Sequence, residues 1–77
     1  MIDNVTIARA RERMALRHEL SWTEQTAAEF WALARRRDAS RHPLAAQAAR
    51  DSAAGYERKV EALRAMLAVP SSAEAAS

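Results

Sequence analysis

Almost nothing in this 77-residue sequence interrupts a helix, because it contains one glycine and two prolines. Alanine, the strongest helix former, supplies 20 of the residues, whereas residues that favour strands are scarce. Neither glycine nor proline occurs from Asp3 to His42, and Pro43 opens a second stretch that runs to Pro70. The sequence therefore predicts an all-α chain with two main arms that meet in a turn near residues 39–42.

The second arm carries the clearer helical pattern. Placed 100° apart, its apolar and small residues share one side of a helix, with charged residues on the other side. This stripe consists of Ala45, Ala49, Ser52, Ala53, Tyr56, Val60, Leu63 and Leu67. Because proline suits the first helical position, we predict a helix over residues 43–68, followed by a disordered tail over 70–77. Gly55, in its middle, costs about 1 kcal/mol relative to alanine, and we interpret it as a close helix crossing.

The size of the residues in this stripe predicts how the two arms pair. The stripe is small up to Ala53 and bulky from Tyr56 onward. In an antiparallel hairpin, residue i then faces roughly residue 81 minus i. Phe30 and Trp31 lie over the small half, while Leu16 and Leu20 meet the bulky half, so that large residues pack against small ones.

The first arm allows two interpretations. Ser21 and Glu24 have the spacing of a capping box, which favours a break and two helices over residues 4–20 and 22–38. The chain would then be a three-helix bundle, with residues 1–69 as a single domain. Alternatively, one stripe from Val5 to Ala34 runs through an unbroken helix, and the chain is a helical hairpin. The N-terminal turns of that helix would then have nothing from the same chain to cover them.

The apolar core is marginal for a monomer of this length. Ordering about 65 residues costs roughly 100 kcal/mol, and most of the apolar fraction is alanine, which buries little area. A second apolar track on the first arm also needs a further helix to cover it. We therefore expect an oligomeric helical bundle, a homodimer or larger. The residues predicted to bind the partner are Trp31, Phe30, Trp22, Ile7 and Met14.

The residues needed for catalysis or metal binding are not arranged for it. There is no cysteine, and neither His18 nor His42 has a second ligand at metal-binding spacing. One glycine cannot build a phosphate-binding loop, and the predicted core face carries only Ser52 and the Tyr56 hydroxyl as polar groups. We predict no enzyme activity, no cofactor and no metal. The sequence also has no long apolar run, so we expect no membrane association and a cytoplasmic location.

Arginine supplies the basic character of the chain and suggests an alternative function. The net charge is +2, with 12 basic and 10 acidic residues. Arginine clusters neutralise phosphates, so a small basic nucleic-acid-binding regulator is the alternative. Its candidate residues are Arg9, Arg13, Arg17, Arg35, Arg36 and Arg37. However, cations at the end of a helix also complement its dipole, and a GC-rich genome enriches arginine and alanine without selection for binding.

The preferred function is protein association. Tryptophan and arginine are enriched at binding hot spots, and the chain has more apolar surface than its own helices can cover. We predict a small helical protein–protein interaction module that acts as an adaptor, inhibitor or accessory subunit and self-associates. Small regulators of bacterial or phage type share this composition.

Overall fold

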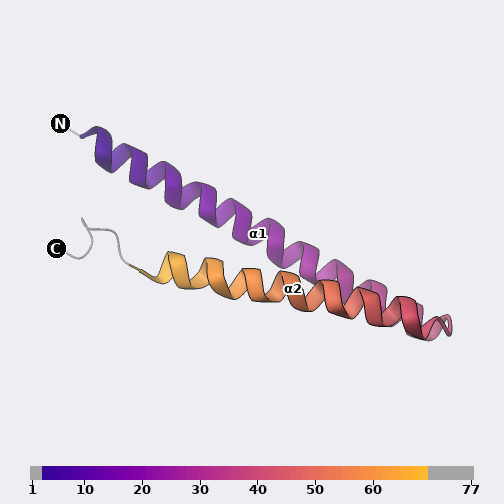
Figure 1. Cartoon of the computed structure of the whole chain (residues 1–77). Helices are drawn as coiled ribbons and strands as arrows, with labels where there is room; N and C mark the ends of the chain where they lie inside the picture. Colours follow the sequence, from indigo (N-terminus) through magenta and orange to yellow (C-terminus); the bar gives the residue numbers. More distant parts are fainter. Residues whose placement is uncertain (1–2, 70–77) are drawn as a thin grey trace.

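The computed structural model describes residues 3–69, which form two helices joined by a short turn (Figure 1). Helix α1 spans Asn4–Ala39 and helix α2 spans Pro43–Ala68. The helices run antiparallel and separate from each other toward their free ends (Figure 1). The described residues contain no strand, so the predicted all-α hairpin with two antiparallel arms is confirmed. The predicted tail over residues 70–77 lies outside the described residues.

Helix α1 is continuous, which corrects the expected break at Ser21. The residues predicted as helices 4–20 and 22–38 form one helix, so the described part of the chain is a two-helix hairpin rather than a three-helix bundle. Ser21 is exposed and helical. The hydroxyl of Thr23 donates to the carbonyl of Glu19 at 2.6 Å, and the hydroxyl of Thr26 donates to the carbonyl of Trp22 at 2.8 Å. Each hydroxyl donates to the backbone carbonyl one helical turn earlier, which is compatible with a continuous helix. In addition, this segment contains no glycine or proline that would favour a break.

The ends of the helices show how the chain enters and leaves each arm. The side chain of Asp3 caps α1, because its Oδ1 accepts hydrogen bonds from the backbone of Val5 at 2.6 Å and of Thr6 at 3.3 Å. This arrangement satisfies two of the N–H groups that a helix leaves unpaired. Helix α2 begins at Pro43, as the sequence predicts, and its preceding residue His42 makes no side-chain cap.

The turn at the end of α1 places a non-glycine residue in a left-handed conformation. Arg41 has a φ of 61°. Its N–H donates to the carbonyl of Asp38 at 3.1 Å, and the N–H of His42 donates to the carbonyl of Arg37 at 2.9 Å. This pair of bonds is the Schellman motif, in which glycine is the usual residue at the left-handed position. Arg41 therefore carries a conformational cost that glycine would not.

A seam of small residues holds the two helices together. The buried residues of α1 are Thr23, Ala27 and Ala34, and those of α2 are Ala46, Ala49, Ala53, Val60 and Leu63. Five of these eight are alanines, so the helices approach closely but exclude little apolar area from water. The residue numbers of facing pairs add to between 78, for Glu19 and Lys59, and 88, for Asp38 and Arg50. The observed register is therefore close to the predicted one.

Gly55 does not lie at a close crossing within the chain, contrary to the interpretation from the sequence. A Cβ atom added to Gly55 would meet only the Nη2 atom of Arg58, at 3.8 Å, which is ordinary contact. The neighbouring space is open on the outer side of α2. The packing of α1 against α2 therefore gives no reason for a glycine at this position.

We expect the substitution Arg41→Gly to stabilise the hairpin by about 1 kcal/mol, because glycine adopts a positive φ without a steric cost. Urea unfolding followed by circular dichroism at a fixed protein concentration measures this change. Arg36→Gly, inside the last turn of α1, serves as the control and should destabilise the protein. Equal destabilisation by both variants would contradict the role assigned to the Arg41 backbone.

Candidate partner-binding surface

The two broad faces of the hairpin, on either side of the seam, differ in character. One face, here called the apolar face, carries bulky residues from α1 and mostly small ones from α2. Its members are Trp22, Phe30 and Leu33 on α1, with Ala45, Ala48, Ser52, Gly55, Tyr56 and Lys59 on α2, and helical spacing adds Thr26 and Met66 to the same side. The opposite side, here called the polar face, is lined mainly by Glu24, Trp31, Glu57, Glu61 and Arg64.

Three aromatic rings form a cluster on the apolar face. Phe30 stacks on Tyr56 with ring centroids 5.5 Å apart. Trp22 meets Tyr56 edge-on, with ring centroids 6.1 Å apart. These are favourable geometries for aromatic pairs. Phe30 and Tyr56 are half-buried, whereas Trp22 remains 55% exposed. The cluster therefore ties α1 to α2 and also presents a large apolar surface to the outside.

Two shallow hollows lie next to this cluster. One has a volume of about 230 Å³ and lies between Phe30, Leu33 and Arg37 of α1 and the small residues of α2 from Ala45 to Ser52. The other has a volume of about 290 Å³ and lies over Ser52 and Gly55, bordered by Lys59. Both are open to the outside and are lined mainly by carbon, a surface suited to side chains of another helix rather than to an enclosed small molecule.

The apolar face carries a cross-helix ion pair, between Lys59 and Glu19 at 2.9 Å, and the polar face carries two further cross-helix polar pairs. The indole N–H of Trp31 donates to Oε1 of Glu57 at 2.8 Å, and Arg64 forms an ion pair with Glu24 at 3.3 Å. A hollow of about 440 Å³ between them is lined by three carboxylates. Trp31, which the sequence grouped with Trp22 and Phe30 as a partner-binding residue, therefore lies on the other side of the hairpin from them.

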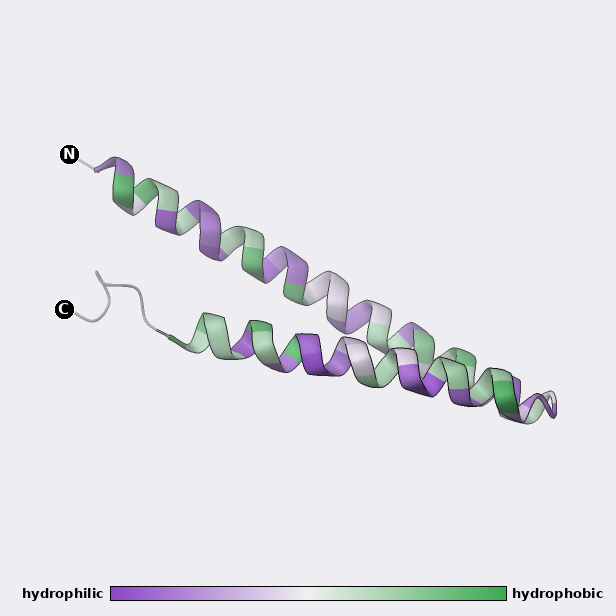
Figure 2. Ribbon diagram, in the orientation of Figure 1, coloured by the Kyte–Doolittle hydropathy of each residue, from purple (hydrophilic) through white to green (hydrophobic). Residues whose placement is uncertain are grey.

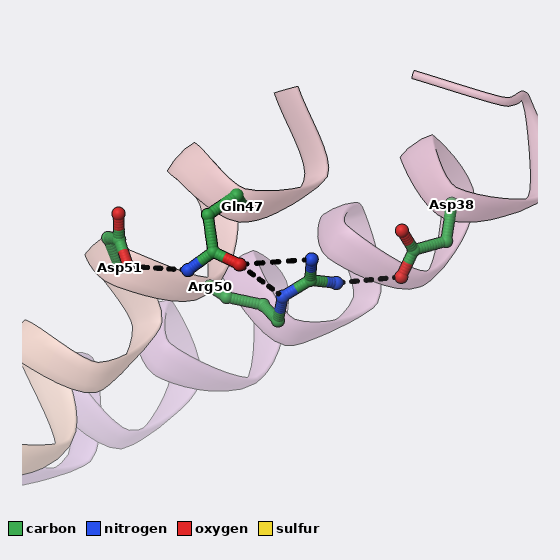
Figure 3. Close-up of polar contacts among 4 residues, drawn as sticks. All are labelled: Asp38, Gln47, Arg50 and Asp51. Atoms are coloured by element: carbon green, nitrogen blue, oxygen red, sulfur yellow. Dashed lines mark hydrogen bonds and ion pairs between the residues drawn. The ribbon is translucent and has the colours of Figure 1, made fainter. Parts of the chain in front are cut away.

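A polar network joins the helices next to the turn (Figure 3). Arg50 donates to Oδ2 of Asp38 at 2.7 Å and to Oε1 of Gln47 at 3.2 and 3.3 Å. The amide of Gln47 donates in turn to Oδ1 of Asp51 at 2.8 Å. Because Arg50 and Asp38 remain 35% and 52% exposed, water screens this ion pair. The network fixes the register at the turn more than it adds stability.

The N-terminal part of α1 extends past the end of α2. Residues 3–12 are all exposed, including Val5 and Ile7, and Met14 is 59% exposed. Hydrophobic residues recur up to this end of α1, as Figure 2 shows. Of the predicted partner-binding residues, Ile7 thus lies on this extension and Met14 lies at its base, next to Arg13, which bonds to the end of α2.

The candidate arginines lie in two groups near opposite ends of α1, about 35 Å apart at 1.5 Å per residue. Arg13 has a structural role, because its guanidinium donates to the carbonyls of Leu67 at 3.0 Å and Val69 at 3.1 Å. These bonds satisfy carbonyls that the C-terminus of α2 leaves unpaired. The remaining members of the set are exposed: Arg9, Arg17, Arg35, Arg36 and Arg37.

Within residues 3–69, no three histidine, aspartate or glutamate side chains are placed to hold a metal ion. Neither described helix has an apolar stretch long enough to cross a membrane. No protein-family model, curated protein or solved structure matches this chain. The clues to function are therefore the two faces of the hairpin and the side chains that they expose.

The sequence reasoning missed most of the α2 side of the apolar face. The signal was present, because Ala45, Ala48, Ser52, Gly55, Lys59, Ala62 and Met66 recur with alternating spacings of three and four residues. The buried seam of α2 follows the same spacing one residue further along. Two adjacent stripes with this period make a helix that packs on two sides.

We expect Arg13→Ala to lower the free energy of unfolding by about 1 kcal/mol, because it removes two hydrogen bonds to the end of α2. Arg17→Ala, one turn further along on an exposed site, is the matched control and should change it by less than about 0.5 kcal/mol. Thermal unfolding at one protein concentration compares the two variants. Equal effects would show that Arg13 does not cap α2.

Proposed function

We propose that this protein is a small helical interaction module that works by self-association and serves as an adaptor, inhibitor or accessory subunit. It acts by binding rather than by catalysis. The observation that carries the proposal is the apolar face, where Trp22 is 55% exposed beside a stacked aromatic pair and Met66, further along α2, is 52% exposed. Exposed apolar surface of this extent is typical of a site of protein association.

The thin seam between the helices supports the same proposal. Burial of apolar area drives folding, and an alanine side chain contributes little of it. Many of the remaining apolar residues lie on the apolar face or the N-terminal extension, where a second molecule is needed to bury them, while Leu44 and Val69 are exposed at the two ends of α2. Helices in proteins gain most of their stability from such packing, whereas isolated helices are only marginally stable in water.

We expect the protein to be at least a dimer at micromolar concentration, with a thermal midpoint that rises with concentration. Trp22→Ala should raise the dissociation constant about tenfold or more, because Trp22 lies on the apolar face. Trp31→Ala should leave it within about threefold, because Trp31 bonds to Glu57 on the polar face.

Light scattering and sedimentation equilibrium measure these masses and constants. The two tryptophan variants form a matched pair that differs only in the face affected. A wild-type monomer with a melting curve independent of concentration would rule out self-association. Equal effects of the two variants would place the binding surface elsewhere.

Nucleic-acid binding by the exposed arginines is tested separately. Phosphate contacts release counterions, so such binding must weaken steeply as salt rises. We expect no salt-dependent binding of duplex DNA or single-stranded RNA beyond weak background, measured by fluorescence anisotropy at 50 and 200 mM salt. Tight binding at low salt that Arg35→Ala and Arg36→Ala both reduce would favour the nucleic-acid function instead.

A further inference from the structure

We infer that the apolar face is covered by the apolar face of a second copy of this chain, with the turns of both hairpins at the same end. This inference rests on the proposed self-association and specifies its geometry. In this arrangement α1 of each copy packs on α2 of the other, and the dimer is a four-helix bundle in which every neighbouring pair of helices is antiparallel. Three features of the described residues support it.

The first feature is the area available. The chain has an accessible area of 5904 Å². A compact monomer of 8.5 kDa exposes about 4,700 Å². This excess is spread over the whole elongated hairpin, and the apolar face alone is about 40 Å long and about 20 Å wide, close to the roughly 800 Å² that each partner buries in an interface of standard size. A second hairpin laid along the apolar face thus has enough surface to form a stable dimer.

The second feature is that the two helices bring residues of complementary size to the face. Helix α1 presents the bulky Trp22, Phe30 and Leu33, whereas α2 presents the small Ala48, Ser52 and Gly55 next to its hollows. A two-fold axis parallel to the helices places the bulky helix of each copy over the small helix of the other, as good packing requires. A copy turned end for end would instead set bulky against bulky and small against small.

The position of Gly55 agrees with this placement. Within the chain, only the guanidinium of Arg58 reaches the space beside it, at 3.8 Å from a Cβ built on Gly55. In the inferred dimer, Phe30 and Leu33 of the second copy lie at this level of α2, and the absence of a Cβ lets that helix approach closely. Toward the open end, the exposed Trp22 of one copy lies near the level of Tyr56 of the other, because the two-fold axis preserves height along the helices and Trp22 lies 6.1 Å from Tyr56 within its own chain.

The third feature is the charge pattern along the outer edges of the face. Glu29 and Arg36 lie along the outer edge of the apolar face on α1. Asp51 and Arg58 lie along the outer edge on α2, and all four residues are exposed. The inferred arrangement places Glu29 beside Arg58 of the second copy and Arg36 beside Asp51 of the second copy. The numbers of both pairs add to 87, almost the value of 88 found for Asp38 and Arg50 inside the chain. Opposite charges thus meet in register along the contact.

The decisive experiment measures the distance between the two turns. The chain has no cysteine, so Ser40→Cys or Ala68→Cys introduces one exposed labelling site at the turn or near the end of α2. In the inferred dimer, spin labels on two copies of either variant lie within about 25 Å, because neighbouring helix axes are about 10 Å apart. In a dimer turned end for end, the turns are separated by about 40 Å, the length of α2 at 1.5 Å per residue.

Double electron–electron resonance on each labelled protein, with light scattering on the same samples, separates the outcomes. A dimer with a short distance at both sites supports the inference. A dimer with a distance of about 40 Å overturns the shared orientation of the turns while leaving self-association intact. A monomer at every concentration overturns both the inference and the proposed self-association.

Two sets of variants test the contacts. Gly55→Leu should weaken dimerisation about tenfold, whereas Ala28→Leu, at an exposed site on the polar face, should leave it within about twofold. Arg36→Glu and Asp51→Arg should each weaken dimerisation about fivefold, because each substitution creates two like-charge pairs across the contact. An equimolar mixture of these two variants should form a heterodimer of near wild-type affinity, because opposite charges then meet in both pairs. Circular dichroism checks that every variant keeps its helix content. A mixture no tighter than either variant alone, or a tight Gly55→Leu dimer, overturns the arrangement.

Discussion

A pair of helices has no interior of its own, and this constraint governs the whole molecule. Two cylinders in contact share one seam, and only residues on that seam escape water. Here the seam is built largely of alanine, so the backbones lie close together while most of the large side chains remain beside the seam rather than within it. The two backbones therefore approach each other closely within the hairpin. Burial of the large side chains, in contrast, needs further helices.

The polar contacts fit this division. Cross-helix pairs such as Arg64 with Glu24 are exposed and screened, so they set the register of the two helices rather than supply much stability. The aromatic cluster around Tyr56 is the exception, because it both joins the helices and faces outward. A surface that is already ordered by contacts within the chain loses less entropy when a partner covers it. The apolar face is thus better prepared for association than the extended N-terminal turns of α1.

Much of the hairpin could be predicted from the sequence, because composition, Pro43 and the apolar stripe of α2 all indicate the same two arms. The approximate register also followed from matching bulky residues with small ones, although Phe30 stacks on the bulky Tyr56 and Trp31 bonds to Glu57 rather than lying over the small residues alone. The break at Ser21 could not be decided in this way, because a capping-box spacing is a local signal and the stripe through Thr23 and Ala27 extends over the whole helix. Tertiary packing along α1 outweighed it. The division between the two faces was harder to predict, since Phe30 and Trp31 are neighbours in sequence yet lie on different sides of the seam.

The hairpin closes most tightly at the turn and separates toward its free ends (Figure 1). Its resistance to local opening should therefore be graded along its length. Amide protons near the turn, held by the alanine seam and the network around Arg50, would exchange with solvent slowly, while those of the first turns of α1 would exchange almost as in an isolated peptide. Arg13 makes the cross-helix hydrogen bonds nearest the N-terminus among the described residues. The turns of α1 before it become ordered only when another surface packs against them.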